Sequence, residues 1–422
     1  MNTKPIKISI MKTTYPAPLR GLLCGLALAT ASTAFGQSSP IFRSGSDGSD
    51  GALDVTTDTT LQLPEDGIFN FTTINVANSA TLTFGKNPAN TPVYLLATGD
   101  VTIDGTISVD GTAATGAAPG AGGPGGFSGG HGNLPGIGPG AGQGPGGGRV
   151  GTAATSSLPR EDLSGAGSYG AQASVSDGRN FHGDIYGSEL LLPLIGGSGG
   201  AGQFNWGFSR VRGNGGGGGG GAILIASDTR IELITGLVSA DGGDGGSSSH
   251  GSGGAIRLVA PQIGGSGTLS AEAGDGTDNG RIRIDAGVFG SQSPFSSSTP
   301  ALRGVATFGI NPVIFPENPP MLTLTNVAGR DISALSADSA VVNLPADGVA
   351  VQPVTVRAEN FDSTVRFVVR VVPARGNGVA EFTGTIDNTT AGEPANATID
   401  VTFPLDTSSQ IFVWTEQFTT QP

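Results

Sequence analysis

The chain has 422 residues, 73 of them glycine, and a formal net charge of −13 from 21 basic and 34 acidic residues. An acidic surface is repelled by nucleic-acid phosphates and by anionic lipid, so we expect neither as a partner. The single cysteine excludes an intramolecular disulfide, and a chain of this length must then rely on its own apolar core.

Residues 1–36 have the order of features that is typical of a secretory signal peptide. A basic leading region without acidic residues is followed by an apolar run over 21–35 and by small residues before Gln37. The run is shorter than the about 20 residues of a membrane span, so we expect cleavage near Gln37, export, and no membrane insertion afterwards. A lipid-anchored Cys24 is the alternative, but Leu22-Leu23 precede it where a small residue is needed. Cleavage leaves 17 basic against 34 acidic residues, a net charge of −17, and no cysteine, which for an exported protein fits a bacterial source.

Short apolar strands recur on both sides of a glycine-rich stretch. The first strand of each repeat stands at 93–97, 222–226, 255–260 and 281–286, and the first three have a matched second strand at 105–111, 236–242 and 267–274. The offsets are similar: 12 residues from Leu95 to Ile107, 14 from Leu224 to Val238, and 13 from Ile256 to Leu269. Near-constant spacing with glycine and aspartate at the corners is typical of a β-solenoid, in which each coil buries its apolar row against the next.

We therefore predict an all-β chain whose first domain, residues 41–310, is a parallel β-helix interrupted by a glycine-rich insert at 111–221. Residues 68–84 fit an earlier coil of the same stack. The alternative, a β-sandwich of unrelated hairpins, predicts no matched offsets. The row that should point inward contains Leu95, Ile107, Leu224, Val238, Ile256, Leu269 and Ile282.

The repeats also resemble those of a known group of proteins. The run Leu-Leu-Ala-Thr-Gly-Asp-Val-Thr-Ile-Asp-Gly-Thr-Ile-Ser-Val-Asp-Gly at 95–111, with Gly-Gly-Ala-Ile-Arg-Leu-Val-Ala at 253–260 and Gly-Arg-Ile-Arg-Ile-Asp-Ala at 280–286, is similar to bacterial secreted glycine-rich parallel β-helix proteins of pectin-lyase-like architecture. The resemblance covers about residues 44–290 and extends loosely to a C-terminal β-sandwich. It implies an extracellular or cell-surface location. Enzymes of the wider class act on acidic polysaccharides through clustered aspartates or a metal with a basic residue, and no such cluster matches this sequence.

The insert contains 39 of the 73 glycines and allows two interpretations. Glycine loses the most conformational entropy on ordering, which favours a flexible loop system. Alternatively, runs such as 122–126 and 213–221 pack as extended glycine helices on the flank of the β-helix. Collagen is excluded because glycine does not recur at every third position. Aromatic side chains in the insert need burial or a partner, and sugar rings stack on such groups, so the expected carbohydrate contacts are Tyr186, Phe204, Trp206 and Phe208.

Patterns associated with catalysis occur about as often as the glycine content predicts. Ser128 and Ser198 each lie in Gly-x-Ser-x-Gly, but about one such match is expected by chance in the insert, and no helix follows either serine. The dinucleotide-like Gly-x-Gly-x-x-Gly at 197–202 also lacks the helix that it requires. We therefore expect no enzyme activity.

Paired aspartates flank glycine at three corners of the predicted coils. Calcium prefers about six to eight oxygen ligands from carboxylates and carbonyls, which tight glycine turns present well. The alternative is that aspartate favours turns because its side chain accepts hydrogen bonds from nearby N–H groups. Calcium is thus one of two interpretations for Asp47, Asp50, Asp241, Asp244, Asp275 and Asp278.

A proline-rich linker at 311–320 precedes a glycine-poor C-terminal segment. Proline stiffens a connection and blocks sheet pairing, which is typical of a domain boundary. Residues 321–422 contain seven short strand candidates, which predicts an antiparallel immunoglobulin-like β-sandwich with Trp414 in its core. The candidates are 321–326, 340–344, 353–358, 364–372, 380–386, 397–403 and 411–416.

Three functions remain open at this point. A secreted or cell-surface structural or adhesive protein, an adhesin, is favoured by the predicted β-helix, the acidic surface and the missing catalytic constellation. A carbohydrate-binding protein that contacts extracellular polysaccharide or another matrix component is second. A polysaccharide-cleaving β-helix enzyme is third, because it needs carboxylates clustered on one face.

Overall fold

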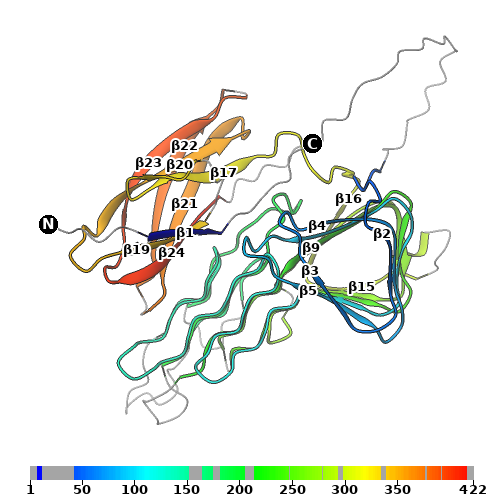
Figure 1. Ribbon diagram of the computed structural model, residues 1–422, viewed down its shortest axis with the longest axis horizontal. Coiled ribbons are helices and arrows are strands. Elements are labelled where there is room, and N and C mark those ends of the chain that lie inside the picture. Colours follow the sequence, from blue (N-terminus) through cyan, green and yellow to red (C-terminus); the bar gives the residue numbers. More distant parts are fainter. Residues whose placement is uncertain are drawn as a thin grey trace.

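The computed structural model describes residues 42–151, 164–173, 181–204, 213–246, 248–277, 279–292, 298–333, 339–375, 378–390 and 392–415, together with the backbone of 7–11. Within these ranges the chain is all-β, and the helical segment that lies fully inside them is the 3-10 turn Gly290–Gln292. Figure 1 shows two bodies: a parallel region (42–309), which includes the glycine-rich insert (111–221), and an antiparallel region (321–415).

Two parallel sheets form the parallel region, and every strand pairing in them is parallel. In Figure 1 the chain runs round a closed outline, with the two sheets on different sides. The larger sheet contains β2 (Gly51–Val55), β4 (Ile68–Val76), β6 (Val93–Ala97), β7 (Val101–Ile103), β9 (Ala222–Ser227), β10 (Arg230–Leu233), β12 (Ala255–Gly265), β14 (Arg281–Phe289) and β16 (Val305–Gly309). The smaller sheet contains β3 (Thr59–Gln62), β5 (Thr81–Gly85), β8 (Thr106–Ser108), β11 (Leu237–Ser239), β13 (Thr268–Ser270) and β15 (Ala301–Arg303).

Apolar side chains of both sheets meet in one core. Six of the seven residues expected to point inward are buried there: Leu95, Ile107, Val238, Ile256, Leu269 and Ile282. The expectation was wrong for Leu224, which pairs with Tyr94 and Arg257 on the opposite face of the sheet. Its neighbour Ile225 occupies the inner row, opposite Leu95. Because side chains alternate along a strand, a one-residue error in the alignment reverses the face.

The larger sheet is also covered on its outer face. Tyr94, Leu96, Ala222 and Leu224 are buried there in a second cluster, with aromatic side chains from the insert and with Trp414. Burial of both faces explains why β6 and β9 are apolar at nearly every position, a composition typical of parallel sheets covered on both sides.

The described part of the insert consists of extended segments that bond to one another through the backbone. Along 215–222, residues three apart donate to the same neighbouring segment, and the three rows of donors face three different segments. Carbonyls of 124–130 accept from the amides of Gly216, Gly219 and Ala222. Carbonyls of 109–116 accept from those of Gly215, Gly218 and Gly221, and carbonyls of 249–252 accept from those of Gly217 and Gly220. Three residues per turn is the period of an extended glycine helix, which was the ordered alternative for this stretch.

These segments approach so closely that they require glycine. A Cβ atom on Gly217 would overlap the carbonyl oxygen of Gly243, and one on Gly200 would overlap that of Ser249. At both positions the three nearest atoms belong to the backbone of other segments. The high glycine content is therefore a packing requirement along these rows. In Figure 1 the insert, cyan to green, forms long segments that run side by side next to the ring.

The antiparallel region has two sheets around one core. All seven strands expected from the sequence are present, and the two-residue β18 (Arg330–Asp331) is additional. One sheet has the order β1-β19-β24-β21-β22, and its β1 (Lys7–Met11) comes from the expected signal peptide. The bounds are β17 (Met321–Val327), β19 (Ser339–Leu344), β20 (Val351–Glu359), β21 (Ser363–Pro373), β22 (Ala380–Asn388), β23 (Ala395–Thr402) and β24 (Thr407–Trp414).

Buried contacts join the antiparallel region to the insert. Arg370 of β21 is fully buried, and its guanidinium donates to the carbonyls of Pro145 (3.0 Å) and Gly147 (2.6 Å). The ring of Phe412 packs edge-on against Phe127, with ring centroids 5.3 Å apart. Trp414, expected in the core of the C-terminal sandwich, is buried instead in the cluster that covers the outer face of the larger parallel sheet.

Candidate functional site

Two of the corner aspartates, Asp47 and Asp275, accept hydrogen bonds from their own turns. Asp47 accepts from the amide of Ser49 (2.9 Å), and Asp275 accepts from both the amide and the hydroxyl of Thr277 (3.1 and 2.7 Å). The hydrogen bonds from the hydroxyl and amide of Ser49 lower the pKa of Asp47 below its usual 3.8. Asp278 lies outside the described residues. This geometry favours the interpretation of these aspartates as turn formers.

Two other corner aspartates also accept backbone hydrogen bonds, Asp244 from its own turn and Asp50 from the neighbouring strand β4. The carboxylate of Asp50 accepts from the amide of Asn70 (2.6 Å), and that of Asp244 accepts from the amide of Gly246 (2.7 Å). No group of three His, Cys, Asp or Glu side chains arranged to hold a metal ion occurs in the part of the chain that the structure describes.

Asp241 belongs instead to a ladder of serines and carboxylates that crosses successive repeats. Its carboxylate accepts from Ser270 Oγ (2.7 Å) and from the amide of Glu272 (2.7 Å) on the next repeat. One repeat earlier, Asp110 accepts from the amide of Asp241 (2.6 Å) and from Ser239 Oγ. The sequence signal is Ser-x-Asp/Glu at the end of each second strand, at 108–110, 239–241 and 270–272. These hydrogen bonds connect each repeat to the next.

Of the four aromatic residues expected to bind sugar, the structure describes Tyr186 and Phe204, and both pack against other side chains. Tyr186 is only 2% exposed, its ring packs on Tyr169 with centroids 4.7 Å apart, and its hydroxyl donates to the carbonyl of Gly196 (2.5 Å). Phe204 is partly buried and packs against the cluster that contains Phe412. Trp206 and Phe208 lie outside the described residues. Tyr186 therefore has no ring face open to a ligand, and the expectation was wrong for this residue.

Ser198, from one of the two nucleophile-like patterns, is also structural. Its hydroxyl is fully buried, donates to Tyr186 Oη (2.9 Å) and accepts from the amide of Gly146 (3.0 Å). Burial raises the pKa of Tyr186 well above its usual 10, so the phenol stays neutral and cannot act as a base at neutral pH.

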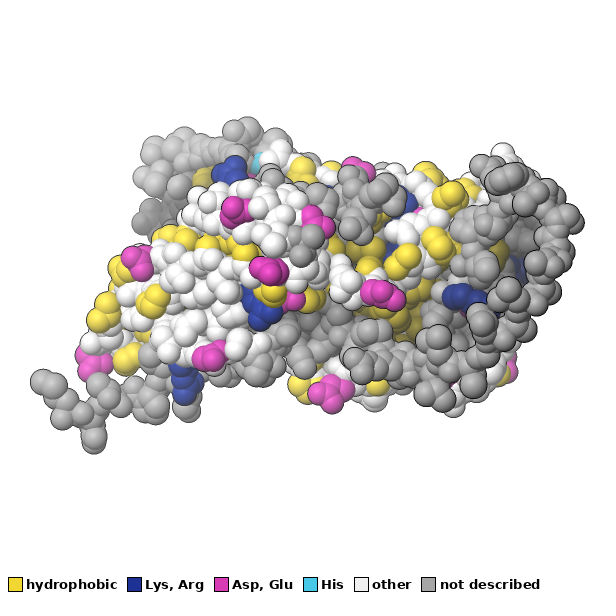
Figure 2. Space-filling model, turned by 90° about the horizontal axis from the view of Figure 1, so that it is seen from above, with side chains coloured by type: hydrophobic (Ala, Val, Ile, Leu, Met, Phe, Trp, Pro, Cys, Tyr) yellow, Lys and Arg dark blue, Asp and Glu magenta, His cyan; other side chains and the backbone are white. Residues whose placement is uncertain are grey.

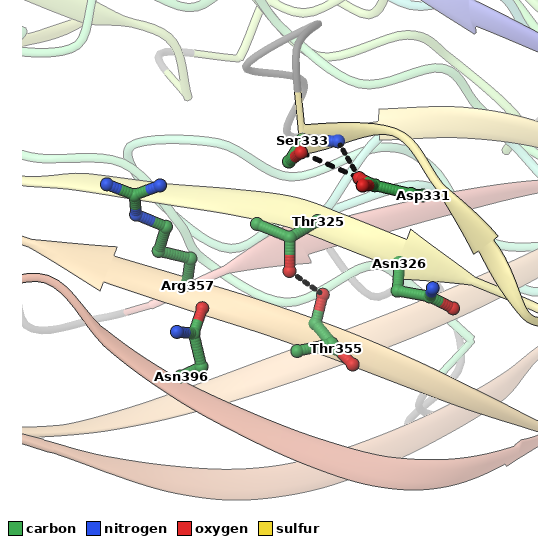
Figure 3. A pocket seen from close by; sticks show the side chains of 7 residues that line it. All are labelled: Thr325, Asn326, Asp331, Ser333, Thr355, Arg357 and Asn396. Atoms are coloured by element: carbon green, nitrogen blue, oxygen red, sulfur yellow. Dashed lines mark hydrogen bonds between the residues drawn. The ribbon is translucent and has the colours of Figure 1, made fainter.

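A shallow hollow of about 450 Å³ lies on the outer face of the four-stranded sheet β18-β17-β20-β23. All the residues that line it are polar, and Figure 3 shows them on adjacent strands and on the segment just after β18: Thr325, Asn326, Asp331, Ser333, Thr355, Arg357 and Asn396. Arg357 and Asn396 are direct cross-strand neighbours. The hollow thus offers amide, hydroxyl, guanidinium and carboxylate groups on one open surface.

Interactions within the sheet hold these side chains in place. Asp331 accepts from both the amide (2.9 Å) and the hydroxyl (2.6 Å) of Ser333, which lowers the pKa of Asp331. Thr325 donates to the carbonyl of Thr355 (3.3 Å). Arg357 Nε lies 2.6 Å from Glu359 Oε1, close enough for an ion pair although the angle is not that of a hydrogen bond. Arg357, Glu359 and Asp331 together carry a charge of −1, so the hollow suits a neutral, hydroxyl-rich ligand better than an anionic one.

Sequence reasoning did not single out the hollow. Its residues occupy the outward positions of alternating strands, as in Thr355 and Arg357 of β20 and Asn396 of β23. Alternation identifies an outward polar face but not where that face is concave. Among the described side chains on the face shown in Figure 2, acidic and basic groups lie scattered singly, without a large patch of one sign.

The sequence matches no protein-family model, and no curated protein or solved structure shows significant similarity to it. No helix in the described ranges is long and apolar enough to cross a membrane. The resemblance to secreted parallel β-helix proteins therefore depends on the repeat motifs alone.

Proposed function

We propose that the chain is exported and acts, without catalysis, as a structural or adhesive protein outside the cell or at its surface. The observation that carries this proposal is that the insert bonds both to the rest of the parallel region and to the antiparallel region. Gly217 and Gly220 donate to the parallel region at 249–252, and Arg370 of the antiparallel region donates to insert carbonyls. A body connected in this way holds an exposed polar sheet face at a fixed position, as an adhesive protein requires.

We further propose that the parallel region is a parallel β-helix and that the antiparallel region is immunoglobulin-like. Support for the first comes from the register: β6, β9, β12 and β14 pair in order, each one repeat after the last, and β8, β11 and β13 do the same in the smaller sheet. Support for the second comes from the two antiparallel sheets around a shared core in about 100 residues.

A second candidate, carbohydrate binding, is favoured by the polar hollow. Its amide, hydroxyl and guanidinium groups match the alternating donors and acceptors of a neutral polysaccharide, and the hollow lies on the open face of a sheet. A polysaccharide-cleaving enzyme would need clustered carboxylates, and the hollow contributes only Asp331, which Ser333 already engages.

The test begins with the location of the protein and continues with its binding. We expect the chain in the extracellular or surface fraction of its source cells with its N-terminus near Gln37; an intact terminus at Met1 or Met11 would contradict export with cleavage. The exported chain is then applied to immobilised neutral and acidic polysaccharides. Carbohydrate binding predicts retention that Asn396→Ala with Arg357→Gln lowers at least fivefold, whereas the nearby Arg330→Gln does not. Release of reducing sugar would overturn the non-catalytic assignment.

A further inference from the structure

The edge of the five-stranded sheet is occupied by a segment that the exported chain is expected to lack. β1 pairs antiparallel with β19 over five residues, from Lys7 opposite Asn343 to Met11 opposite Ser339. The other edge of β19 pairs continuously with β24. Because residues 1–36 have the features of a signal peptide, cleavage near Gln37 removes β1 and leaves the outer backbone groups of β19 without partners.

The sequence of β19 itself lacks the features with which edge strands are protected. Its sequence, Ser-Ala-Val-Val-Asn-Leu, contains no charged residue and no proline, and its pairing with β24 has no bulge. Such an edge is a template for another strand, and the five-residue pairing with β1 shows that it accepts an antiparallel one.

We propose that β19 of the exported chain pairs antiparallel with β19 of a second copy, which joins two five-residue edges across a two-fold axis at Val341. This inference rests on the export and cleavage proposed above. Copies related by a two-fold axis perpendicular to the sheet keep the same face toward their cores, so Ala340 meets Val342 of the partner and Ser339 meets Asn343.

The composition of β19 supports a second copy as the occupant. The strand has no charge with which to select an acidic or basic partner, and its apolar positions meet one another when it pairs with itself. Ala340 and Val342 already point into the core, whereas Val341 is half-buried on the opposite face. The net charge of −17 on each exported chain opposes association, so added salt should strengthen the dimer.

Cross-linking tests the geometry directly, because the exported chain contains no cysteine. Directly opposite residues of antiparallel strands have Cα atoms about 4.5–5.5 Å apart, within the range of a disulfide. Val341→Cys should therefore give a covalent dimer under mild oxidation. Thr385→Cys, exposed on β22 at the far end of the same sheet, should stay monomeric and serves as the matched control. Equal, slow cross-linking of the two variants would overturn the proposal.

A second variant measures association without cross-linking. Light scattering after gel filtration should show a dimer for the exported chain, a monomer for Val341→Lys with at least tenfold weaker association, and a dimer for Thr385→Lys, all with the same circular dichroism. A monomeric exported chain at every concentration and salt would contradict the pairing while leaving export intact. Mass spectrometry that finds residues 7–11 still attached would instead contradict the cleavage and, with it, this inference.

Discussion

The two parallel sheets and the glycine-rich insert lie against each other but are held by different interactions. In the sheets the contacts are between side chains: Leu95, Ile225 and Ile256 are fully buried in one core. In the insert the contacts are between backbones: Gly217 donates to the carbonyl of Ser249 and has no space for a Cβ atom. Burying a Leu or Ile side chain contributes about 1.5–3 kcal/mol, whereas a backbone hydrogen bond contributes about 1 kcal/mol net.

This difference determines what each part tolerates. The sheets should accept exchanges among apolar residues of similar volume, because their stability depends on buried area. The insert should accept almost no side chain at its internal glycines, because its stability depends on many weak bonds made at close approach. It also depends on its neighbours, since rows of donors on one segment must find carbonyls on three others.

The largest expected effect is in the side-chain core. Ile225→Ala removes buried methyl groups and leaves a cavity, so the free energy of unfolding should fall by about 2–5 kcal/mol. Ile234, which is 41% exposed in the same region, is the matched control, and its exchange for Ala should change stability by less than about 0.5 kcal/mol. Denaturant unfolding followed by circular dichroism measures both. Equal losses would show that Ile225 does not belong to the core.

The next largest expected loss of stability tests the interface between the insert and the antiparallel region. Arg370→Met removes two charge-assisted hydrogen bonds to carbonyls of the insert and leaves Glu381 with fewer partners, at a cost of about 3 kcal/mol. The antiparallel region should then unfold in a separate, earlier transition. Arg330→Met, on the exposed β18, should keep the wild-type profile. A single unchanged transition for Arg370→Met would mean that the side chain does not couple the two regions.

A smaller effect tests the packing of the insert. Gly217→Ala adds one methyl group where the backbone of Gly243 already lies, and overpacking of this kind costs about 1–3 kcal/mol. The same change at Gly378, whose added Cβ would meet only Pro373 at an ordinary 3.7 Å, should be neutral within about 0.5 kcal/mol. Amide hydrogen exchange over 213–221 and 249–252 should accelerate only in the Gly217 variant. Unchanged exchange would argue that these segments are not closely packed.

The same contrast explains how much of the molecule the sequence could predict. Strands were recognised where apolar and polar residues alternate, as in β21, or where spacing repeats, as for Leu95 and Ile107. The inner face of β9 was misjudged because Ala-Ile-Leu-Ile-Ala is apolar on both faces, and only the pairing of Ile225 with Leu95 decides which side points inward. The three-fold bonding along 215–222 left no residue pattern, since every position from 215 to 221 is glycine. The hollow at Arg357 combines side chains of β17, β20 and β23, and composition does not show which of their outward positions come together.

The smallest effect separates the two interpretations of the corner aspartates. Asp47 of the parallel region and Asp387 of the antiparallel region have the same local geometry, because each accepts hydrogen bonds from the amide and hydroxyl of the residue two positions later, Ser49 or Thr389. These bonds lower the pKa of both carboxyls below 3.8. Only Asp47 has a second aspartate three residues on, as a calcium site would need.

If both aspartates are turn formers, titration by NMR should give depressed pKa values that calcium and a chelator leave unchanged. Ser49→Ala should return the pKa of Asp47 toward 3.8, and Thr389→Ala should do the same for Asp387. The sign of the stability effect follows: a carboxyl whose pKa is lower in the folded state stabilises it above pH 3.8, and that contribution is lost as the pH falls through the folded-state pKa. In the Ser49→Ala variant, the free energy of unfolding should therefore fall slightly less steeply as the pH is lowered below 3.8. A pKa of Asp47 that rises on chelation, while that of Asp387 does not, would establish calcium at the corners of the parallel region.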